Sequence, residues 1–88
     1  MIFRAHAIRR MFERDVDDAD VQHVLTHGVV IEAYPEDKPC PSKLILGWVN
    51  SRPLHVVIAN AKDVDIVVTV YEPDLQRWEP GFKLRRKK

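Results

Sequence analysis

Two groups of side chains in this sequence have the types and spacing to handle a phosphate group. His6, Arg10 and Arg14 follow one another at intervals of four residues, so a helix aligns them along one ridge. His55 and Tyr71 fall in two segments of alternating residues, each on the side away from the main apolar set. Histidine exchanges a proton near neutral pH, and arginine stabilises charge on phosphate, so these residues together could act on a phosphodiester.

Each group also has a structural interpretation, and the residues alone leave both open. Arginine stems can cover the edge of a core while their heads pair with carboxylates. In that case Arg14, nearest the apolar side of its helix, is expected to pair with Glu72 or Glu32. His55 and Tyr71 could equally cover one face of a sheet with their polar tips in water.

The charge distribution divides the chain unequally. Residues 83–88, "KLRRKK", hold five of the 14 basic residues and no acid, so residues 1–82 carry nine basic against 13 acidic residues, a formal −4. We therefore expect one domain over 1–82 and a basic tail over 83–88, because 88 residues suffice for one small core. Such a tail either binds an anionic partner or only solubilises the chain.

The composition excludes several functional classes. The three glycines are isolated, which excludes a P-loop and a dinucleotide fingerprint. The single cysteine, Cys40, excludes an internal disulfide and is typical of a cytoplasmic protein. His23 and His27 have the spacing of metal ligands but lack further ligands beside them, so we expect no metal and no cofactor. No apolar run approaches the roughly 20 residues of a membrane span.

Hydrophobic periodicity predicts two helices at the start of the chain. The first covers about residues 4–14, with an apolar face made of Phe3, Ala7, Ile8, Met11 and Phe12. Asp17 is the expected N-cap of the second, with Asp20 completing a capping box. The second helix ends near residue 27, where Gly28 follows. The two helices therefore form a hairpin.

After Gly28 the apolar residues recur every second position, as they do in a strand. This pattern predicts strands over residues 29–34, 43–49, 54–60 and 66–72. Three prolines make residues 35–42 a loop, and residues 72–82 are expected to be irregular and to pack back through Trp78 or Phe82. The expected fold is α+β, in the order ααββββ, with the helical hairpin packed on a mainly antiparallel sheet of three to four strands.

Three stretches resemble a family of small bacterial and archaeal domains of unknown function with a His-Ala-x-x-Arg-Met-x-x-Arg signature. They are "HAIRRMFERDVDDADVQHVLTHGVVIEAYPED" and the segments "SKLILGWVNSRPLHVVIA" and "DIVVTVYEPDLQRWEPGFKLRR", which together span nearly the whole chain. The signature includes His6, Arg10 and Arg14. The layout is similar to that of RelE/ParE toxins of toxin–antitoxin systems, which implies either a metal-independent messenger-RNA endonuclease or a gyrase inhibitor, with an antitoxin protein as partner.

The resemblance suggests where such chemistry would reside. By region alone, His55 and Tyr71 are the expected catalytic residues, and the expected binders of RNA or ribosomal phosphate are Arg77, Lys83, Arg85 and Arg86. The near-neutral charge departs from the strongly basic character usual in that group. The alternative is a non-catalytic module of the same fold that binds protein or nucleic acid.

Overall fold

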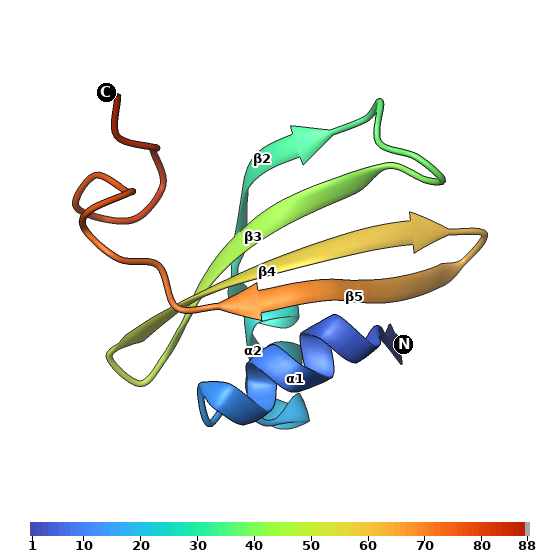
Figure 1. Ribbon diagram of the computed structural model, residues 1–88, viewed down its shortest axis with the longest axis horizontal. Helices are drawn as coiled ribbons and strands as arrows, with labels where there is room; N and C mark the ends of the chain where they lie inside the picture. Colours follow the sequence, from blue (N-terminus) through green and yellow to red (C-terminus); the bar gives the residue numbers. More distant parts are fainter. Residues whose placement is uncertain (88) are drawn as a thin grey trace.

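The expected order of two helices and four strands is present, and one further strand precedes it. In the computed structural model, which describes residues 1–87, the elements are β1 (Ile2–Phe3), α1 (Ala5–Glu13), α2 (Asp18–His27), β2 (Val29–Tyr34), β3 (Ser42–Val49), β4 (Arg52–Ala61) and β5 (Val64–Tyr71) (Figure 1). The strand order across the sheet is β1-β5-β4-β3-β2. Among residues 1–87, no helix has the length and hydropathy needed to cross a membrane.

The sheet has five strands rather than the expected three to four, and it is mixed, because one parallel pairing joins three antiparallel ones. Strands β2 to β5 pair antiparallel in chain order, as expected of a mainly antiparallel sheet. The added strand β1 pairs parallel to β5, with Ile2 opposite Ile66 and Phe3 opposite Val67. A two-residue strand has no period of its own, so only its partner β5 defines it.

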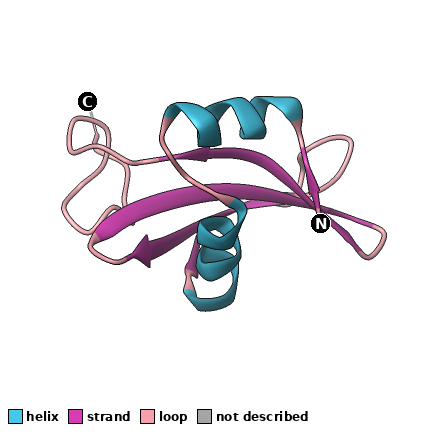
Figure 2. Ribbon diagram, turned by 90° about the horizontal axis from the view of Figure 1, so that it is seen from below, coloured by secondary structure: helices cyan, strands magenta, loops and turns pink. Residues whose placement is uncertain are grey.

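The helices lie along different parts of the sheet. Helix α1 packs beside β5, and α2 packs against β3 and β4 (Figures 1 and 2). The main core joins buried residues of both helices to those of the sheet: Ala7, Met11, Val16, Val21, Val24, Ile45, Leu54, Val56, Ile58, Val67 and Val70. The expected capping box is confirmed, because Asp17 accepts from the Asp20 N–H and the Asp20 carboxylate accepts from the Asp17 N–H.

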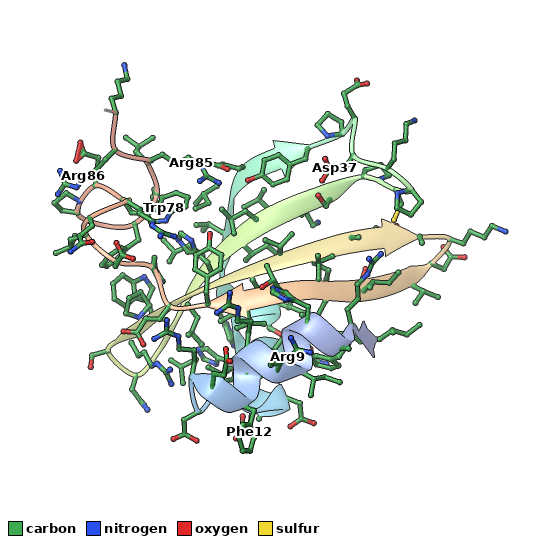
Figure 3. All side chains as sticks on the ribbon, in the orientation of Figure 1. Arg9, Phe12, Asp37, Trp78, Arg85 and Arg86 are labelled. Carbon is green, nitrogen blue, oxygen red and sulfur yellow. The ribbon has the colours of Figure 1, made fainter. Side chains whose placement is uncertain are left out.

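Helix α1 buries a narrower stripe than its apolar residues predict. Ala7 and Met11 are buried, but Ile8 is 56% exposed and Phe12 is 89% exposed. Phe12 points away from the sheet (Figure 3). The expected five-residue face was therefore too broad, because a helix beside the edge of a sheet has neighbours on one side only.

The C-terminal segment, defined here as residues 72–87, folds over the sheet face opposite the main core. The predicted return through Trp78 is confirmed, since this side chain is buried and packs edge-on against His55 at 4.4 Å between ring centroids. Trp78 and Arg85 lie on the side of the segment that faces the sheet, and Arg86 lies on its outer side (Figure 3). Arg86 donates its N–H to the Arg77 carbonyl at 2.9 Å, so the segment doubles back on itself.

Gly28 joins α2 to β2 where no side chain fits, which yields a first prediction. A Cβ at this position would press on the carbonyl oxygens of Val24 and Leu46 and would lie 2.8 Å from Ile45 Cγ2. We expect Gly28→Ala to lower the unfolding free energy by about 2 kcal/mol, because backbone atoms cannot move aside cheaply. Urea unfolding measures this loss.

Gly81→Ala is the matched control. A Cβ there meets nothing within 4 Å, so the cost is only that of its φ of +92°, about 1 kcal/mol. An equal or smaller loss for Gly28→Ala would contradict the packing described at the α2–β2 junction.

Candidate functional site

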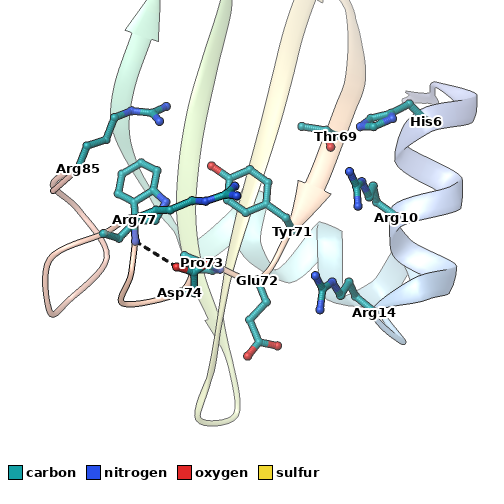
Figure 4. A pocket seen from close by; sticks show the side chains of 11 residues that line it. His6, Arg10, Arg14, Thr69, Tyr71, Glu72, Pro73, Asp74, Arg77 and Arg85 are labelled. Atoms are coloured by element: carbon teal, nitrogen blue, oxygen red, sulfur yellow. Dashed lines mark hydrogen bonds between the residues drawn. The ribbon is translucent and has the colours of Figure 1, made fainter. Parts of the chain in front are cut away.

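A pocket of about 310 Å³ opens between α1, the end of β5 and the C-terminal segment. Its walls come from these three parts of the chain: His6 and Arg10 from α1 with Arg14 from the C-cap of that helix, Thr69 and Tyr71 from β5, and Glu72, Pro73, Asp74, Arg77, Trp78 and Arg85 from the segment (Figure 4). The helical ridge predicted from the four-residue spacing therefore faces the pocket. The structure also brings Tyr71 and two of the predicted phosphate-binding arginines, Arg77 and Arg85, to the same cavity.

The charge of the pocket is predominantly positive. Its two carboxylates are already engaged, because Glu72 pairs with Arg52 at 2.7 Å and Asp74 accepts the N–H groups of Gln76 and Arg77. Arg10 makes only an exposed contact with Glu13 at 3.5 Å. Within residues 1–87, the guanidinium groups of Arg14 and Arg77 have no hydrogen-bond or ion-pair partner. These two cations are thus free to bind an anion from solution.

The expected pairing of Arg14 with Glu72 or Glu32 is wrong. Glu72 forms its ion pair with Arg52, which also donates hydrogen bonds to the backbone carbonyls of Arg14 and Asp15. Glu32 pairs with Arg85, which donates two hydrogen bonds to its carboxylate at 2.9 and 3.1 Å. Arg52 therefore connects the end of α1 to the sheet, and the Arg14 side chain has no ion-pair partner in the part of the chain that the structure describes.

His55 is enclosed, unlike the solvent-facing residue that either sequence interpretation required. It does point to the sheet face away from the helices, opposite Tyr71 in the β4–β5 register, but Trp78 covers it and its exposure is 0%. Both ring nitrogens have partners: Nδ1 lies 3.1 Å from the Tyr71 hydroxyl and Nε2 lies 2.9 Å from the Phe82 carbonyl oxygen. His55 therefore cannot touch a ligand in the pocket except through Tyr71.

Burial governs the protonation of this pair. It lowers the pKa of the His55 imidazole below its ordinary 6.5, and the nearby Arg85 charge acts in the same direction, while the Phe82 carbonyl and Glu32 oppose it. Burial likewise raises the pKa of the Tyr71 phenol above its ordinary 10.0. Both side chains are consequently neutral at neutral pH.

The depressed pKa of His55 predicts how stability depends on pH. Below its ordinary pKa of 6.5 the unfolded chain binds a proton on this imidazole that the folded chain resists. The unfolded state then carries more protons, so we expect the unfolding free energy to fall as the pH drops from about 7.5 to about 5. Urea unfolding at a series of pH values measures the slope.

His55→Gln isolates the contribution of this residue, because His6, His23 and His27 are present in both proteins. The variant is expected to be less stable at neutral pH and to show a flatter slope over the same window. An unchanged slope would show that His55 does not resist protonation in the folded state.

The Arg85–Glu32 pair anchors the C-terminal segment to β2. The Arg85 guanidinium also lies 4.7 Å from the centre of the Trp78 ring, and the Tyr34 hydroxyl donates to Glu32. The hydrogen bonds from Arg85 lower the pKa of the Glu32 carboxyl although partial burial opposes them. Arg85 therefore lines the pocket while much of its charge is neutralised.

The remaining predicted phosphate-binding residues lie elsewhere. Arg86 pairs with Glu79 at 3.0 Å and donates to the Leu75 carbonyl, so it holds the segment together. Lys83 borders a separate hollow beside Trp48 and His27. The structure thus splits the predicted set of four basic residues into two that reach the pocket and two that do not.

No group of three or more His, Cys, Asp or Glu side chains within residues 1–87 is placed to hold a metal ion. His23 and His27 do lie together on α2, with ring centroids 4.7 Å apart. The chemistry that the pocket itself offers is binding of an anion by guanidinium groups beside a phenol hydroxyl.

The comparison with protein families identifies the chain's relatives. A family model described as a domain of unknown function, DUF4258, matches residues 3–72. The chain belongs to the DUF4258 family. The DUF4258 match includes the ridge on α1 and the His55–Tyr71 pair, and it ends before Arg77 and Arg85. Comparisons with curated proteins and with solved structures give no significant match. The resemblance to RelE/ParE toxins stays a prediction.

Proposed function

We propose that this protein binds RNA by holding a backbone phosphate in the pocket between α1 and the C-terminal segment, and that it acts there as a toxin-like, metal-independent endoribonuclease. The observation that supports this proposal is that Arg14 and Arg77, which have no side-chain partner among residues 1–87, line one pocket with the Tyr71 hydroxyl. Guanidinium groups suit phosphate because their planar N–H donors match its oxygens. At about 310 Å³ the pocket lies at the lower end of ligand-site volumes.

Cleavage in this proposal uses Tyr71 as the residue that touches the substrate. The ribose 2′-oxygen attacks phosphorus, the bond from phosphorus to the 5′-oxygen breaks, and a 2′,3′-cyclic phosphate forms. The 2′-hydroxyl proton passes to the Tyr71 oxygen while the Tyr71 proton moves to His55 Nδ1, which lies 3.1 Å away. The departing 5′-oxygen takes a proton from water. Arg14 and Arg77 stabilise the charge that develops on phosphate.

The second candidate is a non-catalytic RNA-binding module, and the enclosure of His55 favours it. Burial disfavours the imidazolium that would form when His55 accepts a proton, as the lowered pKa indicates. The same arginines would then bind RNA without cutting it. The two candidates share the binding site and differ only in the fate of the bound RNA.

Expression in a bacterial host tests the toxin proposal. We expect induction to arrest growth, and we expect the double variant Arg14→Gln, Arg77→Gln to restore it, because the variant removes the two free cations of the pocket. Immunoblotting confirms equal protein levels. Co-expression of an antitoxin protein, the partner that the toxin proposal requires, should also restore growth. Normal growth at high levels of the unaltered protein would contradict the toxin proposal. The proposal that the pocket binds RNA would then be tested by a direct binding measurement.

A further inference from the structure

The hydrogen bonds around His55 fix the direction in which the Tyr71 hydroxyl points its proton. The Phe82 carbonyl oxygen can only accept, so the Nε2 atom 2.9 Å from it carries the proton. A neutral imidazole has one N–H, which leaves Nδ1 as an acceptor. The Tyr71 O–H, 3.1 Å from Nδ1, is therefore the donor in that contact.

This arrangement is difficult to reverse. If Tyr71 turned its proton toward the pocket, Nδ1 would lose the one partner it has among residues 1–87. His55 is 0% exposed and covered by Trp78, so no water would replace that partner. A buried acceptor without a partner is disfavoured on the order of tenfold or more. Burial lowers the pKa of His55 and so keeps the imidazole neutral at neutral pH. In that state Nδ1 remains an acceptor and Tyr71 remains the donor.

The consequence concerns the polarity of the pocket. The Tyr71 hydroxyl donates its single proton to His55 in a hydrogen bond. Toward the pocket its oxygen can therefore only accept a hydrogen bond. The neighbouring guanidinium groups can only donate. Thr69, the other hydroxyl in the lining, rotates freely between both roles and does not discriminate. The carboxylates in the lining are already engaged, because Glu72 pairs with Arg52 and Asp74 accepts two backbone N–H groups. The pocket thus presents donors for an anion and, in the Tyr71 oxygen, an oriented neutral acceptor beside them.

We infer that Tyr71, held by His55, selects a ligand with a hydroxyl next to its phosphate, so that the pocket prefers ribose to deoxyribose. This inference rests on the proposed phosphate binding. Of the two sugars, only ribose carries a 2′-hydroxyl beside the 3′-phosphate, and that hydroxyl can donate to the Tyr71 oxygen. His55 is a positioning residue in this scheme, and Tyr71 determines the specificity.

The test compares uridine 3′-phosphate with 2′-deoxyuridine 3′-phosphate, two ligands that cannot be cleaved by 2′-hydroxyl attack. Dissociation constants come from titrations followed by nuclear magnetic resonance. We expect the ribonucleotide to bind about three- to tenfold more tightly, the contribution of one hydrogen bond. Tyr71→Phe should bring the ratio of the two constants close to one. His55→Leu, which leaves the Tyr71 proton without an acceptor at this position, should reduce the ratio in the same way.

Arg77→Gln separates this inference from the proposed function. It should weaken both nucleotides about tenfold or more and leave their ratio unchanged, because a guanidinium contacts the phosphate that both ligands share. Equal binding of the two nucleotides by the unaltered protein, or an unchanged ratio in Tyr71→Phe, would overturn the inference. If Arg77→Gln changes neither constant, phosphate binding in this pocket is itself contradicted.

Discussion

Replacing Arg14 and Arg77 together by glutamine is expected to lower the affinity for a single-stranded RNA about 100-fold or more. Each guanidinium lacks a protein partner within residues 1–87, so all of its hydrogen-bonding capacity is available to phosphate. A hydrogen bond to a charged group contributes about 1.5–3 kcal/mol, and the two side chains come from separate parts of the chain. Glutamine preserves most of each stem, so packing is little disturbed. Fluorescence anisotropy of a labelled RNA measures the change.

Arg9→Gln is the matched control for this prediction. Arg9 is an exposed cation on α1 that does not line the pocket. Arg9→Gln should change the RNA affinity only through the overall electrostatic potential of the protein. We expect a change of a few-fold at most at physiological salt, where surface charges are screened over about 8 Å. If Arg9→Gln weakened binding as much as the double variant, RNA would be held by diffuse surface charge and the pocket would have no special role.

Tyr71→Phe is expected to slow RNA cleavage by about 100-fold or more while changing RNA affinity only a few-fold. General acid–base catalysis by one positioned side chain is typically worth about 10²–10⁴-fold. Phenylalanine keeps the ring that packs edge-on against His55 at 5.1 Å and removes the oxygen that would carry the proton. Single-turnover cleavage of an end-labelled RNA gives the rate constant, and anisotropy gives the affinity.

Tyr34→Phe removes a similar hydroxyl outside the pocket. Tyr34 lies on β2, where its hydroxyl donates to Glu32, and it is absent from the pocket lining. Its cleavage rate should stay within a few-fold of that of the unaltered protein. Equal rates for Tyr71→Phe and the unaltered protein would remove Tyr71 from the mechanism. Undetectable cleavage by the unaltered protein, with tight RNA binding, would establish the non-catalytic candidate.

Local patterns predicted the elements whose stability depends on nearby residues. The capping box at Asp17 and Asp20 places the start of α2 within three residues of sequence, and alternation places β2 to β5. The ridge of His6, Arg10 and Arg14 follows from helical geometry alone. These predictions succeed because the interactions concerned join residues close together in the chain.

Interactions between residues far apart in the chain could not be predicted from local sequence patterns. The partners of the Arg85–Glu32 pair are 53 residues apart, and neither position differs in type from other arginine and glutamate positions that remain exposed. Residues 72–87 have no period that places Trp78 over His55, so the enclosure of His55 was not predictable. The two-residue β1 exists only through its pairing with β5.

The salt dependence of RNA binding tests most directly whether the pocket between α1 and the C-terminal segment holds phosphate. The logarithm of the binding constant for a single-stranded RNA falls with the logarithm of salt concentration by about 0.7 for each phosphate neutralised. If Arg14 and Arg77 together neutralise the one phosphate held in the pocket, the double glutamine variant should have a slope shallower by about 0.7 than that of the unaltered protein, and Arg9→Gln should keep the original slope. An identical slope in the double variant would show that neither arginine contacts the RNA backbone, which contradicts the proposed site.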